Sequence, residues 1–238
     1  MKFGIIAAGE GIRFKESGIS TPKPFLKVND ISLAERAFIN ASSNGFESIN
    51  FIINEDNSSF RDMLEQYSDE YSIPLNLVVK TTPSSFHSFY ELGKFLDGSD
   101  FCLTTIDSIF SQTEFGNYIT ACENTISSGM LAVTDFVDDE KPLWVSINER
   151  DNITAFLDSR DKETFVTGGI YYFKNGVYEY AEKALDLKIQ RLRNFLRFLL
   201  KNNLQIDAFR FKKIIDVDRW HDIEIADKYL KEELYSGK

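Results

Sequence analysis

An apolar run near the N-terminus ends in two closely spaced glycines and a basic residue. In FGIIAAGEGIRF, residues 3–14, the run leads into Gly9, Gly11 and Arg13, and Lys23 follows ten residues after Arg13. Glycines directly after a strand let a ligand approach the backbone closely, and successive backbone N–H groups can surround anionic oxygens. Arg13 adds a forked, permanently charged donor and Lys23 a mobile point charge. This spacing predicts a phosphate site; the alternative is a tight turn with an Arg and a Lys on the surface.

Two common phosphate-binding motifs do not fit these residues. A dinucleotide-binding fingerprint needs a third small residue at position 14, where the following helix packs on the strand, and Phe14 stands there. A P-loop needs Gly-Lys-Ser/Thr beginning at the same position, which Phe14 also excludes.

The segment IIAAGEGIRF and the later TPKPFLKV (21–28) resemble the signature of the nucleotidyltransferases related to nucleotide-sugar pyrophosphorylases. In that family a hydrophobic strand runs into A-A-G-x-G-x-R, and P-K-x-L follows. The resemblance implies that Arg13 and Lys23 are catalytic residues that contact the phosphates. It also implies a set of residues that bind the nucleotide, namely Ala7, Ala8, Gly9 and Gly11.

Two aspartates match the metal ligands of this family. One lies at the end of a central strand, where FCLTTIDSIF has Asp107, and one lies before the last helix, where IIDVDRWHDIEIA has Asp216 and Asp218. Asp218 fits the second metal position best, with Asp216 left open, and Asp222 is expected in the first helical turn, where the macrodipole favours a carboxylate. The resemblance therefore implies a Mg²⁺ ion held by Asp107 and Asp218, since Mg²⁺ takes one or two carboxylates plus substrate oxygens and water.

The segments that would recognise the base and the acceptor are less specific. Many family members carry a Gly-Thr-Ala-type run at the base, whereas this chain has TTPSSFHSF. Ser84 and Ser85 occupy that place and would bind the nucleotide or cap a helix. VTGGIYYF resembles the glycine-bearing strand that lines the sugar pocket, which implies that Gly169 lies beside the acceptor; the alternative is a bulge. The base itself stays undetermined.

The resemblance implies a reaction in which a phosphorylated acceptor attacks the α-phosphorus of a nucleoside triphosphate and pyrophosphate leaves. The attacking phosphate oxygen is already ionised at neutral pH, so no general base is needed, and positioning and electrostatics dominate phosphoryl chemistry. A sugar-1-phosphate is the favoured acceptor.

Four other functions stay open. They are transfer to phosphocholine, transfer to another small phosphate, a glycosyltransferase of the related GT-A type, and a non-catalytic nucleotide sensor. Glycosyltransferases of that type rely on Asp-x-Asp at a strand end, which TTIDSIF lacks, although DVD at 216–218 has the pattern.

The periodicity of the chain predicts the elements that must position these residues. Apolar runs bounded by turn residues predict strands, and apolar residues at helical spacing predict helices. Strands are expected in 3–8, 48–54, 75–80, 100–106, 130–136, 143–159 (two, around Asp151-Asn152), 164–174 and within 206–220 (the closing strands). Helices are expected in 32–45, 58–71, 85–97, 176–203 (two) and 220–235.

Alternating strands and helices indicate an α/β fold. The resemblance sharpens this to a three-layer α/β/α, Rossmann-like fold of the GT-A type, with a mixed, mostly parallel sheet and helices on both faces. No linker or repeat divides residues 1–238, so a single domain is expected, with nucleotide binding in about 1–110 and acceptor binding in about 111–238.

Composition narrows the class of protein. A formal net charge of −10 opposes general nucleic-acid binding, which depends on a surplus of Lys and Arg. No segment approaches the roughly 20 apolar residues that span a bilayer, so no membrane partner is expected. Cys102 and Cys122 form no ligand pair and are expected as small buried hydrophobes, which favours a reducing, cytoplasmic location. Oligomeric state cannot be predicted from the sequence.

Overall fold

A computed structural model describes residues 1–9, 12–16, 18–19, 21–137, 141–160, 162 and 165–236. Within these residues, nine strands form one sheet and two short strand pairs lie outside it. The strands of the large sheet are β1 (Lys2–Ala7), β4 (Ile49–Ile53), β5 (Leu75–Val79), β6 (Phe101–Thr105), β8 (Gly129–Thr134), β9 (Trp144–Ile147), β10 (Ile153–Leu157), β11 (Phe165–Phe173) and β12 (Ile206–Arg210). The short pairs are β2 (Lys27–Val28) with β3 (Ile31–Ser32), and β7 (Ser108–Phe110) with β13 (Ile214–Asp216).

The sheet has a parallel part and a mixed part. Strands β6, β1, β4 and β5 run parallel in that order, and β12 pairs in parallel with β8. Strand β11 is antiparallel to its three partners β6, β8 and β9, and it joins the strands of the first half of the chain to those of the second half. The predicted mixed, mostly parallel sheet is confirmed.

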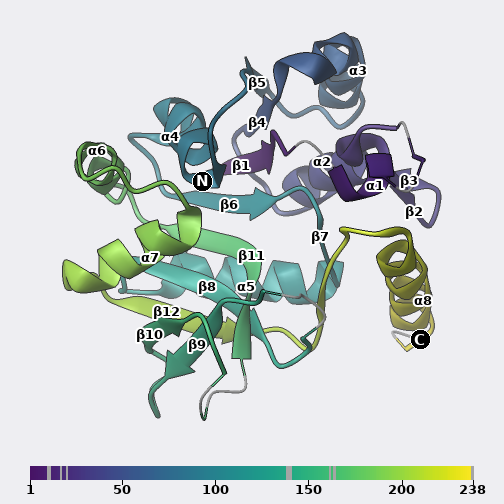
Figure 1. Cartoon of the computed structure of the whole chain (residues 1–238). Helices are drawn as coiled ribbons and strands as arrows, with labels where there is room; N and C mark the ends of the chain where they lie inside the picture. Colours follow the sequence, from purple (N-terminus) through teal and green to yellow (C-terminus); the bar gives the residue numbers. More distant parts are fainter. Residues whose placement is uncertain are drawn as a thin grey trace.

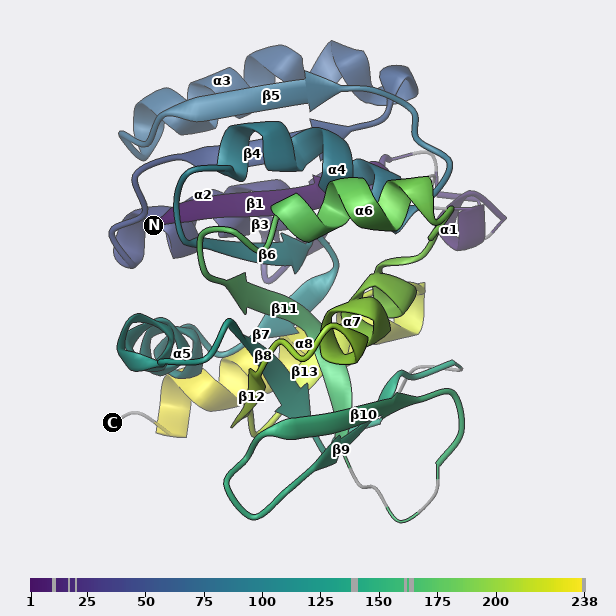
Figure 2. The same ribbon diagram turned by 90° about the vertical axis from the view of Figure 1, so that its left-hand side faces the viewer.

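Helices cover both faces of the sheet (Figures 1 and 2). The two helices α4 (Ser85–Leu96) and α7 (Leu192–Lys201) contact each other, and α6 (Glu179–Asp186) packs on α7. Figure 2 looks onto this face. The other face carries α2 (Leu33–Ser43), α3 (Arg61–Glu70), α5 (Gln112–Asn124) and α8 (Trp220–Ser236). A short helix, α1 (Ile12–Glu16), follows β1.

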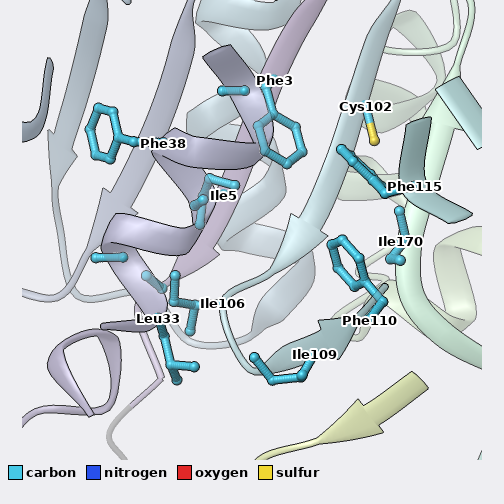
Figure 3. Packing of buried hydrophobic residues seen from close by; sticks show 14 of the residues in the cluster. Phe3, Ile5, Leu33, Phe38, Cys102, Ile106, Ile109, Phe110, Phe115 and Ile170 are labelled. Atoms are coloured by element: carbon cyan, nitrogen blue, oxygen red, sulfur yellow. The ribbon is translucent and has the colours of Figure 1, made fainter. Parts of the chain in front are cut away.

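Alternation along β1 explains why each face has its own core. Phe3 and Ile5 point into the cluster under α2 and α5, whereas Ile6 belongs to the cluster under α4 and α7. Figure 3 shows the first cluster, in which Phe115 lies beside Cys102 and Ile5 lies beside Phe3. The expectation that both cysteines are buried is confirmed, and burial raises the pKa of the Cys102 thiol.

Most expected elements are present, with one local correction. The helix expected from Ser58 onward begins instead as a 3₁₀ turn, Glu55–Phe60, whose first residues are capped by the side chain of Asn54, and α3 starts only at Arg61. Of the described helices, none is long and apolar enough to cross a membrane.

Candidate active site

The carboxyl ends of β1 and β6 border a cavity of about 500 Å³. Open α/β sheets bind ligands outside the carboxyl ends of their strands, and ligand pockets have volumes of roughly 300–1,000 Å³. Residues expected to bind nucleotide, phosphate and metal come together in its wall. The lining residues with expected roles are Ala7, Ala8, Gly9, Arg13, Lys23, Ser84, Ser85, Asp107 and Asp218.

Lys23 lies between the two carboxylates at the centre of this wall. Its Nζ donates to Oδ2 of Asp107 and to Oδ1 of Asp218, each at 2.6 Å. The Lys23 side chain is only 9% exposed, whereas the Asp218 side chain is 38% exposed. The three groups come from segments more than 80 residues apart, so the whole fold is needed to assemble them.

Arg13 adds a second cation to the cluster. Its Nη1 donates to Oδ2 of Asp218 at 2.5 Å, on the carboxylate whose other oxygen accepts from Lys23. Among the described residues, these two cations and two carboxylates balance in charge. In such a cluster the two basic side chains can pair with an incoming anion while the two carboxylates pair with an incoming cation.

Backbone contacts hold the two carboxylates in place. Strand β13 pairs antiparallel with β7, and beyond this pair Val217 N donates to the carbonyl oxygen of Asp107 at 3.0 Å. Asp222 Oδ2 accepts from the backbone N–H groups of Asp218 at 2.8 Å and Arg219 at 2.6 Å. Asp222 thus reaches back from the first turn of α8, as in half of a capping box, and fixes the loop that carries Asp218.

A short 3₁₀ turn, Lys23–Phe25, positions the lysine. Pro22 precedes the turn and Pro24 lies within it, so two fixed φ angles limit its backbone freedom. The ring of Phe25 is buried and stacks on Phe60 with centroids 4.0 Å apart. Aromatic packing therefore anchors the segment that carries the lysine.

Lys23 and Asp107 keep each other ionised. Burial by itself would lower the pKa of Lys23, but the fields of Asp107 and Asp218 outweigh it and raise the pKa above the usual lysine value. Burial by itself would raise the pKa of Asp107, but Lys23 outweighs it and the carboxyl pKa lies below its usual value.

The residues present fit a divalent cation bound by two carboxylates. Asp107 and Asp218 offer hard oxygen donors, and Oδ1 of Asp107 is buried without a hydrogen-bond partner. Among the described residues, no group of three or more His, Cys, Asp or Glu is placed to hold a metal. The donor set suits an ion such as Mg²⁺, which completes its shell with substrate oxygens and water.

Another part of the same cavity is lined by hydroxyl groups. Ser84 lies at the start of α4, but its Oγ is 2.9 Å from Nδ1 of His87 and does not cap the helix. Ser85 Oγ accepts from Leu192 N at 3.2 Å. The alternative that the side chains of these two serines cap the helix is therefore wrong.

A second cavity of about 190 Å³ adjoins the first and shares Thr105 and Asp107 with it. Gly169 lines it, at the point where the register of β11 against β8 shifts. The bulge that was the alternative for Gly169 is therefore present, and its position beside the acceptor stays a prediction. The remaining polar lining consists of Thr134, Thr167, Tyr171, Arg193 and Asp216.

Backbone conformation and packing require glycine at position 169 but not at position 9. Gly169 has φ +74°, and a Cβ there would lie 2.4 Å from Ser108 Oγ. A Cβ at Gly9 would meet none of the described atoms within 4 Å, so packing against them does not require glycine at this position. Gly11 lies outside the described residues, and its expected contact with phosphate stays a prediction.

The family can be assigned at this point. The sequence model of the family described as "Nucleotidyl transferase" matches residues 4–234. The chain belongs to the nucleotidyl transferase family. None of the curated proteins matches it.

Solved structures share the fold of this nucleotidyltransferase. The inositol-1-phosphate CTP transferase from T. maritima superposes with a TM-score of 0.79 at 19% identity, covering 95% of each chain. A Bacillus anthracis protein assigned as a glucose-1-phosphate thymidylyltransferase, solved with sucrose, gives a TM-score of 0.84 at 16% identity, covering 96% of this chain and 94% of the other.

In this nucleotidyltransferase the structure brings most of the expected site residues to one place and separates two of them from the cluster. Gly169 and Asp216 line the second cavity, whereas Asp218 pairs with the cations of the first. Sequence reasoning missed the positioning contact of Asp222. The sequence signal for this contact is the place of Asp222 at the third position of the last helix, from which a carboxylate can accept from the backbone N–H before the helix. Arg193 and Thr134 carried no signal, because nothing in their local sequence shows which cavity they face.

Proposed function

We propose that the protein is a Mg²⁺-dependent nucleotidyltransferase that joins a nucleoside triphosphate to a sugar-1-phosphate and releases pyrophosphate. The observation that carries the proposal is the cluster of Lys23, Arg13, Asp107 and Asp218 at the border of two cavities. The larger cavity has a volume suited to a nucleotide, and the smaller one opens beside it at Asp107.

The side chains have complementary parts in the transfer. Arg13 and Lys23 would bind the triphosphate and stabilise the charge that develops on leaving pyrophosphate, since preorganised cations in a site of this kind lower the barrier electrostatically. Asp107 and Asp218 would hold the divalent cation, which supplies further charge neutralisation when bound. The acceptor phosphate is ionised near neutral pH, with a second pKa of about 6, so the chain needs no general base.

The lining of the second cavity supports a polyhydroxylated acceptor. Hydroxyl groups of Thr105, Thr134 and Thr167 and the carboxylate of Asp216 offer donors and acceptors to sugar hydroxyls, and Arg193 offers a cation. The two structural neighbours are named for inositol-1-phosphate and glucose-1-phosphate, which agrees with an acceptor of this chemistry.

Phosphocholine fits this cavity less well. A quaternary ammonium is recognised by open aromatic faces. The ring of Phe136 lines the cavity, but the Lys213 ammonium already lies 4.1 Å from its centroid. A second cation would be repelled there.

The glycosyltransferase alternative is also disfavoured. Its Asp-x-Asp would need both carboxylates of DVD on one cation, but Asp216 lines the second cavity and Asp218 the first, with the buried Val217 between them. A non-catalytic nucleotide sensor would not need a complete catalytic cluster. Turnover decides between the nucleotidyltransferase and the sensor.

The test is pyrophosphate release with Mg²⁺ across a grid of nucleoside triphosphates, including dTTP, against sugar-1-phosphates, inositol-1-phosphate and phosphocholine. We expect one nucleotide and one sugar-type phosphate to give turnover, and Lys23→Ala to lower the rate by at least about 100-fold. Lys27→Ala, an exposed lysine on β2, is the matched control and should retain wild-type turnover. Near wild-type turnover in Lys23→Ala would contradict the assignment.

A further inference from the structure

Lys23 bridges the two carboxylates that a shared divalent cation would need, and together with Arg13 it engages both oxygens of Asp218. Its Nζ lies 2.6 Å from Oδ2 of Asp107 and 2.6 Å from Oδ1 of Asp218, so one ammonium bridges the pair. A cation bound by both oxygens would have to take the place of Nζ. The lysine and the metal ion are therefore competitors for one position.

We propose that Lys23 keeps the Asp107–Asp218 pair closed to divalent cations until a triphosphate offers the lysine new partners. This inference rests on the proposed function, because it concerns the same site. It assigns Lys23 a second role, control over when the metal ion binds, in addition to contact with the phosphates.

The burial of the lysine makes the exchange unfavourable without nucleotide. The Lys23 side chain is 9% exposed, so its ammonium cannot turn to water without a change in the surrounding structure. Displacing it would leave a buried charge without a partner, which is strongly destabilising. Arg13 donates to the same Asp218, so its guanidinium would repel a cation that approaches this carboxylate.

Hydrogen bonds hold the backbone that carries each carboxylate. The carbonyl of Asp107 accepts from Val217 N at 3.0 Å, and Asp222 holds the backbone at Asp218 and Arg219. Phosphate oxygens entering the cavity would give Lys23 and Arg13 anionic partners, and only then would both aspartates be released. Metal and nucleotide binding would thus be positively coupled.

The test is Mn²⁺ binding to the nucleotide-free protein, measured from the paramagnetic resonance signal of free Mn²⁺. Lys23→Met removes the competing charge and keeps most of the side-chain volume. We expect it to bind Mn²⁺ at least about 5-fold more tightly than the wild type, the lower end of ordinary coupling between sites. Lys27→Met should behave as the wild type, and adding Asp218→Asn to Lys23→Met should abolish the gain. Unchanged or weaker Mn²⁺ binding in folded Lys23→Met would overturn the proposal.

A second comparison does not depend on the folding of Lys23→Met. Without nucleotide, the wild type should bind Mn²⁺ no more tightly than the double variant Asp107→Asn/Asp218→Asn. Tighter binding by the wild type would show that the pair is open and would overturn the proposal. Both measurements omit substrates, so they are independent of pyrophosphate release: turnover without the Mn²⁺ effect removes this inference alone, and the Mn²⁺ effect without turnover removes the proposed acceptor chemistry alone.

Discussion

At the scale of single residues, the site depends on charges that hold one another in place. Asp107 and Lys23 are both buried more than isolated charges tolerate, and each shifts the pKa of the other toward its ionised form. A pair of this kind stays charged over a wide range of pH. This is suitable for a catalyst that works by fixed electrostatics and moves no proton.

We expect Asp107→Asn to lower the free energy of unfolding by about 1–3 kcal/mol, because it leaves the buried Lys23 with one charged partner fewer. The folded pKa of Asp107 is lowered, so its contribution is present above the unfolded value near 3.9 and is lost only as pH falls through the lower folded pKa. The folded pKa of Lys23 is raised, so its contribution persists up to the unfolded value of about 10.4 and beyond.

The difference in unfolding free energy between wild type and Asp107→Asn should therefore be constant from about pH 5 to pH 9. Urea unfolding of both proteins at pH 5, 7 and 9 measures it. A difference that varies strongly within this range would show that the pair titrates there.

A second residue-scale prediction concerns Gly169. Gly169 and Gly176 both have positive φ, +74° and +93°, but only at 169 would a Cβ meet other atoms, Ser108 Oγ at 2.4 Å and Thr105 Oγ1 at 2.6 Å. Gly176→Ala should cost about 1–2 kcal/mol for backbone strain alone. Gly169→Ala should cost at least about 1 kcal/mol more, because it adds overpacking. Equal losses in thermal or urea unfolding would mean that Gly169 is required only for its backbone conformation.

At the scale of elements, two short structures assemble the site. The β7–β13 pair brings the loop after β13 to the turn after β6, and the first turn of α8 then fixes Asp218 through Asp222. Neither β7 nor Asp222 lines either of the two cavities. Both decide where the second carboxylate lies.

We expect Asp222→Ala to lower transfer activity and to cost about 1 kcal/mol of stability, the usual loss for a helix cap. Asp222→Asn keeps an oxygen that accepts from Asp218 N and Arg219 N, so it should restore most of both. Steady-state rates and urea midpoints of the two variants test this. An Asn variant as impaired as the Ala variant would show that the charge of Asp222 matters and its cap does not.

The same elements show what the sequence can and cannot predict. Most of the long strands and helices follow from apolar periodicity, although the 13-residue helix α5 was not predicted. Arg13 and Lys23 were selected as phosphate contacts from residue types and spacing, and Asp107 and Asp218 from the resemblance to the family. The three-residue strand β7 was not predicted, and β13 was expected only as one of the closing strands, because the pairing of these two strands is set by tertiary contact and not by local pattern. The contact between Arg13 and Asp218, 205 positions apart, likewise depends on the order of strands in the sheet.

At the scale of the whole molecule, both halves of the chain contribute to one site. The first half supplies Arg13, Lys23 and Asp107, and the second supplies Asp218 and most of the smaller cavity. Strand β11 joins the two halves within one sheet. The division into a nucleotide-binding part before about 110 and an acceptor-binding part after it stays a prediction. A formal charge of −10 places the neutral cluster in an acidic protein, so anionic substrates depend on contacts inside the cavity.

The central claim is that an oxygen of the acceptor phosphate attacks the α-phosphorus of the nucleotide at this border between cavities. The most direct measurement uses the substrate pair from the grid, with ¹⁸O in every phosphate oxygen of the acceptor, followed by mass spectrometry of both products. The account predicts that all the label stays in the nucleotide-linked product and that pyrophosphate is unlabelled and equimolar with it. Labelled pyrophosphate, or release of a nucleoside monophosphate in its place, would contradict the account.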